Sequence, residues 1–284
     1  MTTQITMEMV KELRTITGVG MSKCKQALQE CGGSVEDAIA HLRKAGMASA
    51  VKKEGREANE GAISFAEDDK AICTIEINAE TDFVIKNETF QKFLKDMAEE
   101  ALATRPANVE AFLAQKFSKD DSTTIDEQRS LIVQTIGENI QIRRVAIFEK
   151  TSNVSVGVYS HMGGKIMAVV EIEGSADQSA FARDIAMHVA AEAPEFLASS
   201  DVPEATIANE RDIAKEQVKG KPENIIDKIV DGKLNAYFNQ FCLLNQKYIK
   251  DSALTIEALI AKQSKESGSE LKLKGFVRWM IGSN

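Results

Sequence analysis

The spacing of the hydrophobic residues predicts three helices at the start of the chain. Within the first 46 residues, apolar side chains recur at helical spacing in three short segments that glycines separate. These stripes consist of Val10, Leu13 and Ile16, then Cys24, Ala27, Leu28 and Cys31, then Val35, Ala38, Ile39 and Leu42. The third segment follows a Ser-x-x-Asp sequence at Ser34, which is typical of a helix start. We therefore predict a three-helix bundle, and a mobile polar tether from about Ala48 to Asn59.

From Gly61 onward, the pattern predicts the same arrangement twice. Ile63 and Phe65 mark a first strand, residues 67–70 a turn, residues 71–78 a half-buried return strand, and residues 87–103 a helix. Later, residues 154–160 and 165–172 predict a second hairpin, and residues 177–191 a second helix. We therefore expect an α+β protein with two related subdomains, each burying one sheet face under helices.

Between about Pro203 and Phe241 the pattern is helical, and Gly220-Lys221-Pro222 interrupts it. Because glycine commonly ends helices and proline commonly begins them, this region predicts an antiparallel coiled-coil hairpin. Its first arm carries few apolar residues, so we expect it to project from the body. The predicted domains are residues 1–54 for the bundle, 55–149 for the first subdomain and 150–284 for the second. The hairpin is inserted in the second subdomain at about residues 202–241.

Composition narrows the classes of protein to consider. The 284 residues carry a net charge of −8, which argues against a general nucleic-acid-binding protein. No apolar run approaches the roughly 18 residues that span a bilayer, and no signal-peptide pattern opens the chain. None of the four cysteines forms a Cys-x-x-Cys pair, so a disulfide scaffold is not expected. These features favour a cytoplasmic protein.

The sequence shows no convincing set of catalytic groups. His41 lies away from most of its apolar stripe, and His161 falls in a predicted turn. His188 shares a helix face with Phe181 and Ile185, which is typical of a satisfied, partly buried histidine. Metal-ligand spacing, a nucleophile elbow and a phosphate-binding glycine loop are all missing from the sequence. We therefore predict a binding protein without a cofactor or metal, and not an enzyme.

The segment Asn78–Val84 is the most distinctive part of the chain, because it places a carboxylate beside a large apolar ring where a strand ends. Binding sites are commonly carried on loops that rigid elements position in this way. A second interpretation is purely structural. In that case Thr81 caps the next helix, Asp82 lies in its first turn and Phe83 belongs to the core.

Several sequence blocks resemble the elongation factor Ts family, in order and along nearly the whole chain. The central one is Glu76-Ile77-Asn78-x-Glu80-Thr81-Asp82-Phe83-Val84. The others are Val10–Arg14 with Thr17-Gly18-x-Gly20-Met21 and Cys24-Lys25-x-Ala27-Leu28, Ile136–Ile140 with Arg143-Arg144, Tyr159-x-His161 with Gly163-Gly164, Ile185–Ala190, Cys242-Leu243-Leu244-x-Gln246 and Phe276–Arg278.

This resemblance implies a guanine-nucleotide exchange factor for elongation factor Tu, active in translation elongation. It implies an amino-terminal bundle like a ubiquitin-associated domain, and a protruding coiled-coil hairpin. Thr81, Asp82, Phe83 and Val84 would displace the Mg²⁺ environment of the GTPase. Phe83 would act as an apolar wedge, and Asp82 would anchor the loop or disturb the field at the ion.

The resemblance also implies further contacts with elongation factor Tu in its GDP-bound and nucleotide-free forms. Met21, which the glycine turn exposes, would dock on the GTPase domain, and the second subdomain would contribute near His188. Ser22 stands where many relatives have a second apolar residue, so the Met21 contact is expected to be narrower. The alternative function is a non-catalytic scaffold that uses the bundle and the hairpin. A third hypothesis is an α+β enzyme that uses His188 or His161.

Overall fold

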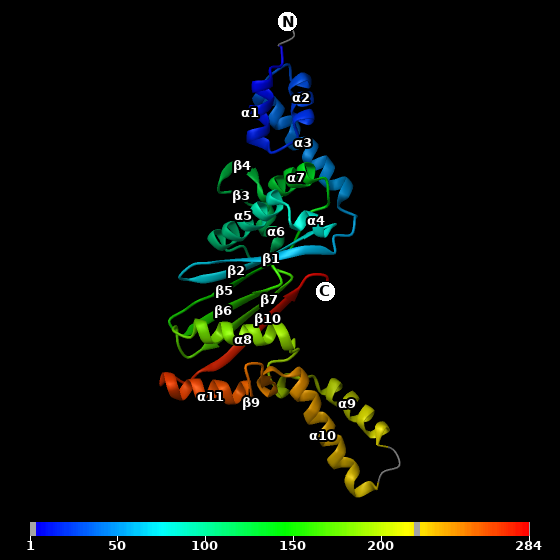
Figure 1. Ribbon diagram of the computed structural model, residues 1–284, viewed down its shortest axis with the longest axis vertical. Coiled ribbons are helices and arrows are strands. Elements are labelled where there is room, and N and C mark those ends of the chain that lie inside the picture. The colour runs from blue at the N-terminus through cyan, green and yellow to red at the C-terminus, as the bar shows by residue number, and fades with distance from the viewer. Residues whose placement is uncertain (1–3, 219–221, 284) are drawn as a thin grey trace. The chain divides into compact units, whose positions relative to one another are not determined.

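The computed structural model describes residues 4–218 and 222–283, and its contacts divide the chain into two compact units (Figure 1). The first unit contains the residues up to Phe148, together with Met162–Lys165 and the residues from Met280 onward. The second contains Glu149–His161 and Ile166–Trp279. Both units combine helices with small antiparallel sheets, which confirms the predicted α+β class. Among the described residues, none of the helices has both the length and the apolar character that a membrane span requires.

Three helices open the first unit, as predicted: α1 (Met7–Thr17), α2 (Met21–Glu30) and α3 (Val35–Lys53). The side chains of Thr6 and Ser34 cap α1 and α3 by accepting backbone N–H groups. The buried core follows the predicted stripes, except that Ile16 is exposed. Val19, from the turn between α1 and α2, is buried in this core although no helical stripe included it.

Helix α3 continues through Lys53, so the predicted mobile tether is wrong for its first part. The second half of α3 packs against α7 (Ile125–Ile136). A Cβ atom on Gly46 would lie 3.3 Å from the Ser130 carbonyl oxygen, so glycine permits this close approach. Packing against a distant helix therefore stabilises residues whose local composition resembles a linker.

The sheet of the first unit has the order β1-β2-β5, formed by β1 (Glu60–Glu67), β2 (Ala71–Ala79) and β5 (Gln141–Glu149). Helix α5 (Glu88–Thr104) packs against β1 and β2. All nine residues of β2 are buried, so the prediction of a half-buried strand is wrong. One polar position of β2 has a charged partner, because Arg144 Nε donates to the buried Glu76 carboxylate at 2.6 Å. The side-chain polar atoms of Thr74 and Asn78 are buried without a hydrogen bond to any described residue.

Shorter elements complete the first unit. They are α4 (Asp82–Ile85), α6 (Val109–Ala114), and a two-stranded ladder of β3 (Lys116–Phe117) with β4 (Asp120–Thr124). Thr124 and Glu127 form a capping box at the start of α7.

The second unit contains a sheet of order β10-β7-β6, formed by β6 (Val154–His161), β7 (Ile166–Glu173) and β10 (Lys272–Met280). Helix α8 (Ser179–Glu192) packs on β6 and β7. The predicted hairpin and helix are thus confirmed, with small shifts at their ends. A Cβ atom on Gly157 would lie 2.1 Å from the Arg183 backbone nitrogen, so glycine is needed where α8 crosses β6.

A pair of helices follows a short 3-10 helix (Ser199–Asp201) and forms what we call the arm, α9 (Glu204–Gln217) and α10 (Glu223–Phe241). The two helices lie side by side (Figure 1) and pack through Ala214, Val218 and Val230. Gly220 and Lys221 of the predicted turn lie outside the described residues. After the arm come a second 3-10 helix (Leu243–Asn245), β8 (Lys247–Tyr248), β9 (Asp251–Thr255) and α11 (Ile256–Ser267).

The two halves of the chain correspond residue by residue in several places. The sequence Gln-Lys-x-x-Lys-Asp-x-x-x-Thr-Ile occurs at 115–125 and again at 246–256. It forms the β3–β4 ladder and the β8–β9 ladder in the same register. In each case the second lysine pairs at 2.8 Å with an aspartate of the helix that packs on the sheet. Lys119 pairs with Asp96 of α5, and Lys250 pairs with Asp184 of α8.

Candidate functional site

The predicted loop begins where β2 ends, and it is short and well supported. Glu80 and Thr81 follow the strand, and Asp82–Ile85 form the single turn of α4. We call residues Thr81–Val84 the projection.

Hydrogen bonds fix the start of the projection to the link between α7 and β5. The Thr81 backbone N–H and hydroxyl donate to the two carboxylate oxygens of Glu138, at 3.0 and 2.7 Å. In return, the Asn139 backbone N–H donates to the Glu80 carboxylate at 2.7 Å. The Asn139 side chain also donates to the Arg56 carbonyl oxygen at 2.8 Å. Bonds to charged groups are stronger than neutral ones, so this reciprocal pair holds the strand end firmly.

Apolar packing fixes the other end of the projection. Val84 and Ile85 are buried in the core cluster of the first unit, and Gln91 Nε2 donates to the Ile85 carbonyl oxygen at 2.6 Å. The side chain of Asn87 then caps α5 by accepting the Thr89 backbone N–H.

Phe83 lies between these two anchors, and 80% of its surface is exposed. The structural interpretation that placed Phe83 in the core is therefore wrong. Thr81 does stand at the N-cap position of α4, but its hydroxyl bonds Glu138 and makes no cap bond. An aromatic ring on a well-supported turn loses little conformational freedom when it enters a partner's pocket, and aromatic residues are enriched among the strong contacts of interfaces.

Asp82 stands beside this ring and is also exposed. Its nearest charged group is Lys86, whose Nζ lies 3.6 Å away one helical turn later. Both side chains face solvent, so this pair contributes little to stability. The carboxylate is therefore free to exchange its lysine for another partner.

The bundle presents Met21 less openly than expected. Met21 is the first residue of α2 and is half-buried, because it packs against the bundle core. Ile16, on the other side of the glycine turn, is the more exposed apolar residue. The turn therefore offers two apolar side chains, of which sequence reasoning placed one inside.

His188 lies inside the second unit, with no exposed surface. Its Nε2 atom lies 3.0 Å from Gln246 Oε1, and its Nδ1 atom accepts the Ile249 backbone N–H at 3.3 Å. Burial lowers the pKa of this imidazole, although the Gln246 bond and the Glu192 charge act in the opposite direction. Because both ring nitrogens are engaged, His188 has no free atom for a substrate or a direct partner contact.

The other two histidines are at the surface. His41 Nε2 lies 3.0 Å from the Glu30 carboxylate, and His161 stacks on Tyr159 with ring centroids 6.0 Å apart. The Tyr159 hydroxyl also lies 3.2 Å from His161 Nδ1. These contacts join each histidine to a near neighbour and assemble no catalytic group with it.

Sequence comparisons identify the relatives of this chain. A model of the family described as Elongation factor TS matches residues 80–283. The protein named Elongation factor Ts from Protochlamydia amoebophila (strain UWE25) is 55% identical over 278 residues, covering 98% of this chain and 99% of the relative. The proteins of the same name from Chlamydia felis and Chlamydia caviae are 46% and 45% identical over 277 residues, covering 98% of each chain. The projection, the bundle and the arm are thus parts of a chain that belongs to the elongation factor Ts family.

Proposed function

We propose that the projection is the part of this protein that opens the Mg²⁺ site of elongation factor Tu. As a family member, the protein is a guanine-nucleotide exchange factor for that GTPase in translation elongation. The observation that best supports this proposal is that Phe83 is 80% exposed while both ends of its loop are held by hydrogen bonds or core packing. The loop therefore enters a partner without first paying for its own ordering.

The proposed mechanism acts on the geometry around the ion. Mg²⁺ demands nearly ideal octahedral coordination, so a small displacement of the elements around it weakens its binding. Phe83 would enter between elements of the GTPase as an apolar wedge. Asp82 would leave Lys86 and accept hydrogen bonds from the partner, or oppose the field that holds the ion. Thr81 and Val84 would set the angle of approach through Glu138 and the core.

The energy available from the ring limits what the projection does alone. Burying a phenylalanine side chain stabilises a complex by ~1.5–3 kcal/mol, which is roughly tenfold to 150-fold in an equilibrium. Larger effects on GDP release need a wider interface. We assign that role to the turn carrying Met21 and Ile16, and to the arm with the part of the second unit around His188.

The architecture supports a separate role for the projection. We propose three domains, 1–54 as a ubiquitin-associated-like bundle, 55–149 and 150–284 as related subdomains, and the coiled-coil arm at about 202–241 as an insertion. In the second subdomain only residues 174–178 connect the hairpin to the long helix α8, whereas in the first subdomain residues 80–87, which include the projection, connect β2 to α5. The hairpin and helix that both subdomains share can therefore form without a projection. We infer that Thr81–Val84 serve binding of the partner and not folding of the subdomain.

The partner is expected to be bound in its GDP and nucleotide-free forms, in the cytoplasm, and without covalent chemistry. If the protein weakens GDP binding, GDP weakens the protein's binding to the GTPase by the same factor. The nucleotide-free complex is therefore the tight one, and incoming nucleotide releases the exchange factor.

Release of fluorescent GDP from elongation factor Tu, followed by stopped flow, tests this function. We expect micromolar concentrations of the chain to accelerate release in a saturable way. Phe83→Ala should slow the stimulated release at least tenfold while thermal unfolding stays unchanged, because the ring is exposed. The matched control is Phe65→Ala, which removes another exposed ring from β1 and should leave release unchanged. Unchanged release with the wild-type chain would favour the scaffold function instead.

A further inference from the structure

The root of the arm contains a buried chain of hydrogen bonds in which His188 joins the Gln246 amide to the turn between β8 and β9. We propose that His188 and Gln246 lock this root, so that His188 is a positioning residue that sets how the arm meets elongation factor Tu. This inference rests on the proposed function only for its effect on the partner.

The root is where the chain leaves α8 and returns from α10. Ala193 ends α8 in a left-handed conformation with φ of 46°. The backbone N–H groups of Glu195 and Phe196 then donate to the Phe241 carbonyl oxygen, and Leu243 N–H donates to the Phe196 carbonyl oxygen. The two ends of the arm are thus tied directly to each other.

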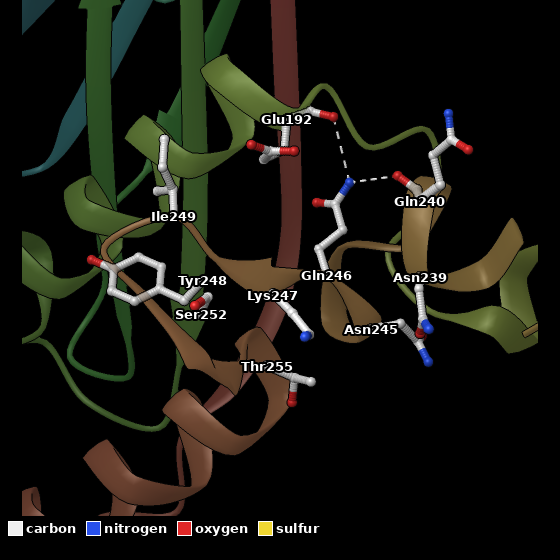
Figure 2. A pocket seen from close by; sticks show the side chains of 10 residues that line it. All are labelled: Glu192, Asn239, Gln240, Asn245, Gln246, Lys247, Tyr248, Ile249, Ser252 and Thr255. Atoms are coloured by element: carbon white, nitrogen blue, oxygen red, sulfur yellow. Dashed lines mark hydrogen bonds between the residues drawn. The ribbon is translucent and has the colours of Figure 1, made fainter. Parts of the chain in front are cut away.

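Gln246 adds a second tie, shown in Figure 2. Its buried side-chain amide donates to the Gln240 carbonyl oxygen at 2.7 Å and to the Glu192 carbonyl oxygen at 3.4 Å. The first acceptor belongs to the last turn of α10, and the second is the last residue of α8. One amide therefore bridges both helices that meet at the root.

His188 orients this amide. Since the Gln246 NH₂ group is used by the two carbonyl oxygens, its Oε1 atom faces His188 and needs a donor. His188 Nδ1 accepts the Ile249 N–H, so the neutral ring carries its proton on Nε2 and supplies that donor. The imidazole thus links the β8–β9 turn to the root of the arm.

The first half of the chain shows what the arm adds. There Glu100 stands in the place of His188 on α5, and it accepts the Ser118 N–H at 3.0 Å, as His188 accepts Ile249. Gln115 stands in the place of Gln246 and donates to Thr104 at the end of α5. A carboxylate has no proton to give to a glutamine oxygen, and this half carries α6 instead of an arm. The half of the chain that carries the arm therefore has a hydrogen-bond donor at this helix position, and the half without an arm has an acceptor.

A cleft of about 620 Å³ opens over this root, and its lining includes Gln246, Gln240, Glu192, Asn239, Asn245 and Lys247 (Figure 2). A side chain that rotated into this space would face water instead of its present partners. The bonds of Gln246 therefore add to the backbone bonds that tie the two ends of the arm, and their loss would expose this side of the root to water.

Three substitutions at position 188 separate the roles of the ring. His188→Gln keeps both a donor and an acceptor, His188→Glu keeps the acceptor alone, and His188→Leu removes both. We expect amide hydrogen exchange in residues 239–249 of the free chain to rise at least tenfold in the Leu and Glu variants. In His188→Gln it should stay within threefold of wild type. Unchanged exchange in His188→Leu, or equal effects in all three variants, would overturn the lock.

Titration against elongation factor Tu tests the consequence for the partner. The Leu and Glu variants should need about tenfold more protein for half-maximal GDP release, while the saturating rate stays within twofold of wild type. A lower saturating rate with an unchanged half-maximal concentration would contradict a role in positioning the arm. Failure of the wild-type chain to stimulate release would instead refute the proposed function, and the hydrogen-exchange result would still decide the lock.

The wild-type chain supplies a measurement that needs no folded variant. Nitrogen-15 NMR of the His188 imidazole should show the neutral form with its proton on Nε2 at pH 7. A ring protonated on Nδ1, or on both nitrogens, would contradict the proposed chain of bonds.

Discussion

At the scale of single residues, Phe83 is effective because of what holds it. The ring gains little from its own protein, since it is 80% exposed. Its position depends on Glu138, which receives two hydrogen bonds from Thr81, and on Val84 in the core. The contact residue and the residues that aim it are therefore different, and they are expected to respond differently to substitution.

Glu138→Ala tests the aiming role. Loss of the two bonds leaves the Thr81 N–H and hydroxyl without their carboxylate acceptor. This loss should destabilise the ordered conformation of the projection by ~1 kcal/mol or more. We expect stimulated GDP release to slow by about threefold to tenfold, and hydrogen exchange of residues 81–85 to rise. The control is Glu110→Ala, an exposed glutamate of α6. If Glu138→Ala matches wild type in both measurements, the projection does not need this anchor.

His188 makes stability depend on pH in a defined direction. Burial lowers the pKa of its imidazole in the folded protein below the ordinary value of 6.5. The folded state therefore binds fewer protons than the unfolded state, and this contribution to stability is lost as the pH falls below 6.5. The midpoint of urea unfolding should fall from pH 7 to pH 5.5 by more in wild type than in His188→Gln. An equal fall in both proteins would exclude His188 as the cause.

At the scale of secondary-structure elements, the close approach of two backbones requires glycine where elements cross. A Cβ atom on Gly157 would lie 2.1 Å from the Arg183 nitrogen, inside the contact of β6 with α8. Gly157→Ala should therefore lower the free energy of unfolding by ~1–3 kcal/mol or more. Gly232→Ala is the matched control, because a Cβ atom there meets nothing within 4 Å in α10. It should raise stability by about 0.5–1 kcal/mol in the same urea titration. A neutral Gly157→Ala would mean that α8 moves away from β6 at little cost.

The sequence predicted most elements, and its failures have physical causes. Helical stripes and turn residues are local, so the bundle helices, both hairpins and the long helices α5 and α8 were predictable. The second half of α3 was not, because its order comes from α7, which follows in the chain some eighty residues later. The burial of Glu76 was also hidden, since its partner Arg144 belongs to β5.

The candidate site was predictable in part. The family resemblance and the end of β2 indicated the projection, but local pattern alone also allowed Phe83 to be a core residue. The anchoring role of Glu138 was not predictable, because its bonds to Thr81 join segments that are far apart in the sequence. A direct signal for the duplicated framework was also present, in the repeat at 115–125 and 246–256, and would have shown the arm as an insertion.

At the scale of the whole molecule, we predict that GDP and the exchange factor each weaken the binding of the other to elongation factor Tu. The affinity of the chain for elongation factor Tu should fall, on adding saturating GDP, by the factor by which the chain lowers GDP affinity. Isothermal titration of both complexes measures the two factors independently. Phe83→Ala should reduce both factors together. Unequal factors for the wild-type chain would mean that an additional binding equilibrium is present.

The wedge is proposed to act through the Mg²⁺ site, and one comparison tests this most directly. GDP release from elongation factor Tu is measured at saturating wild-type chain and at saturating Phe83→Ala, in excess Mg²⁺ and again in excess EDTA. We expect at least a tenfold difference in rate between the two proteins in Mg²⁺, and nearly equal rates once the ion has been removed. A tenfold difference that persists in EDTA would contradict it, because the ring would then act on the nucleotide without the ion.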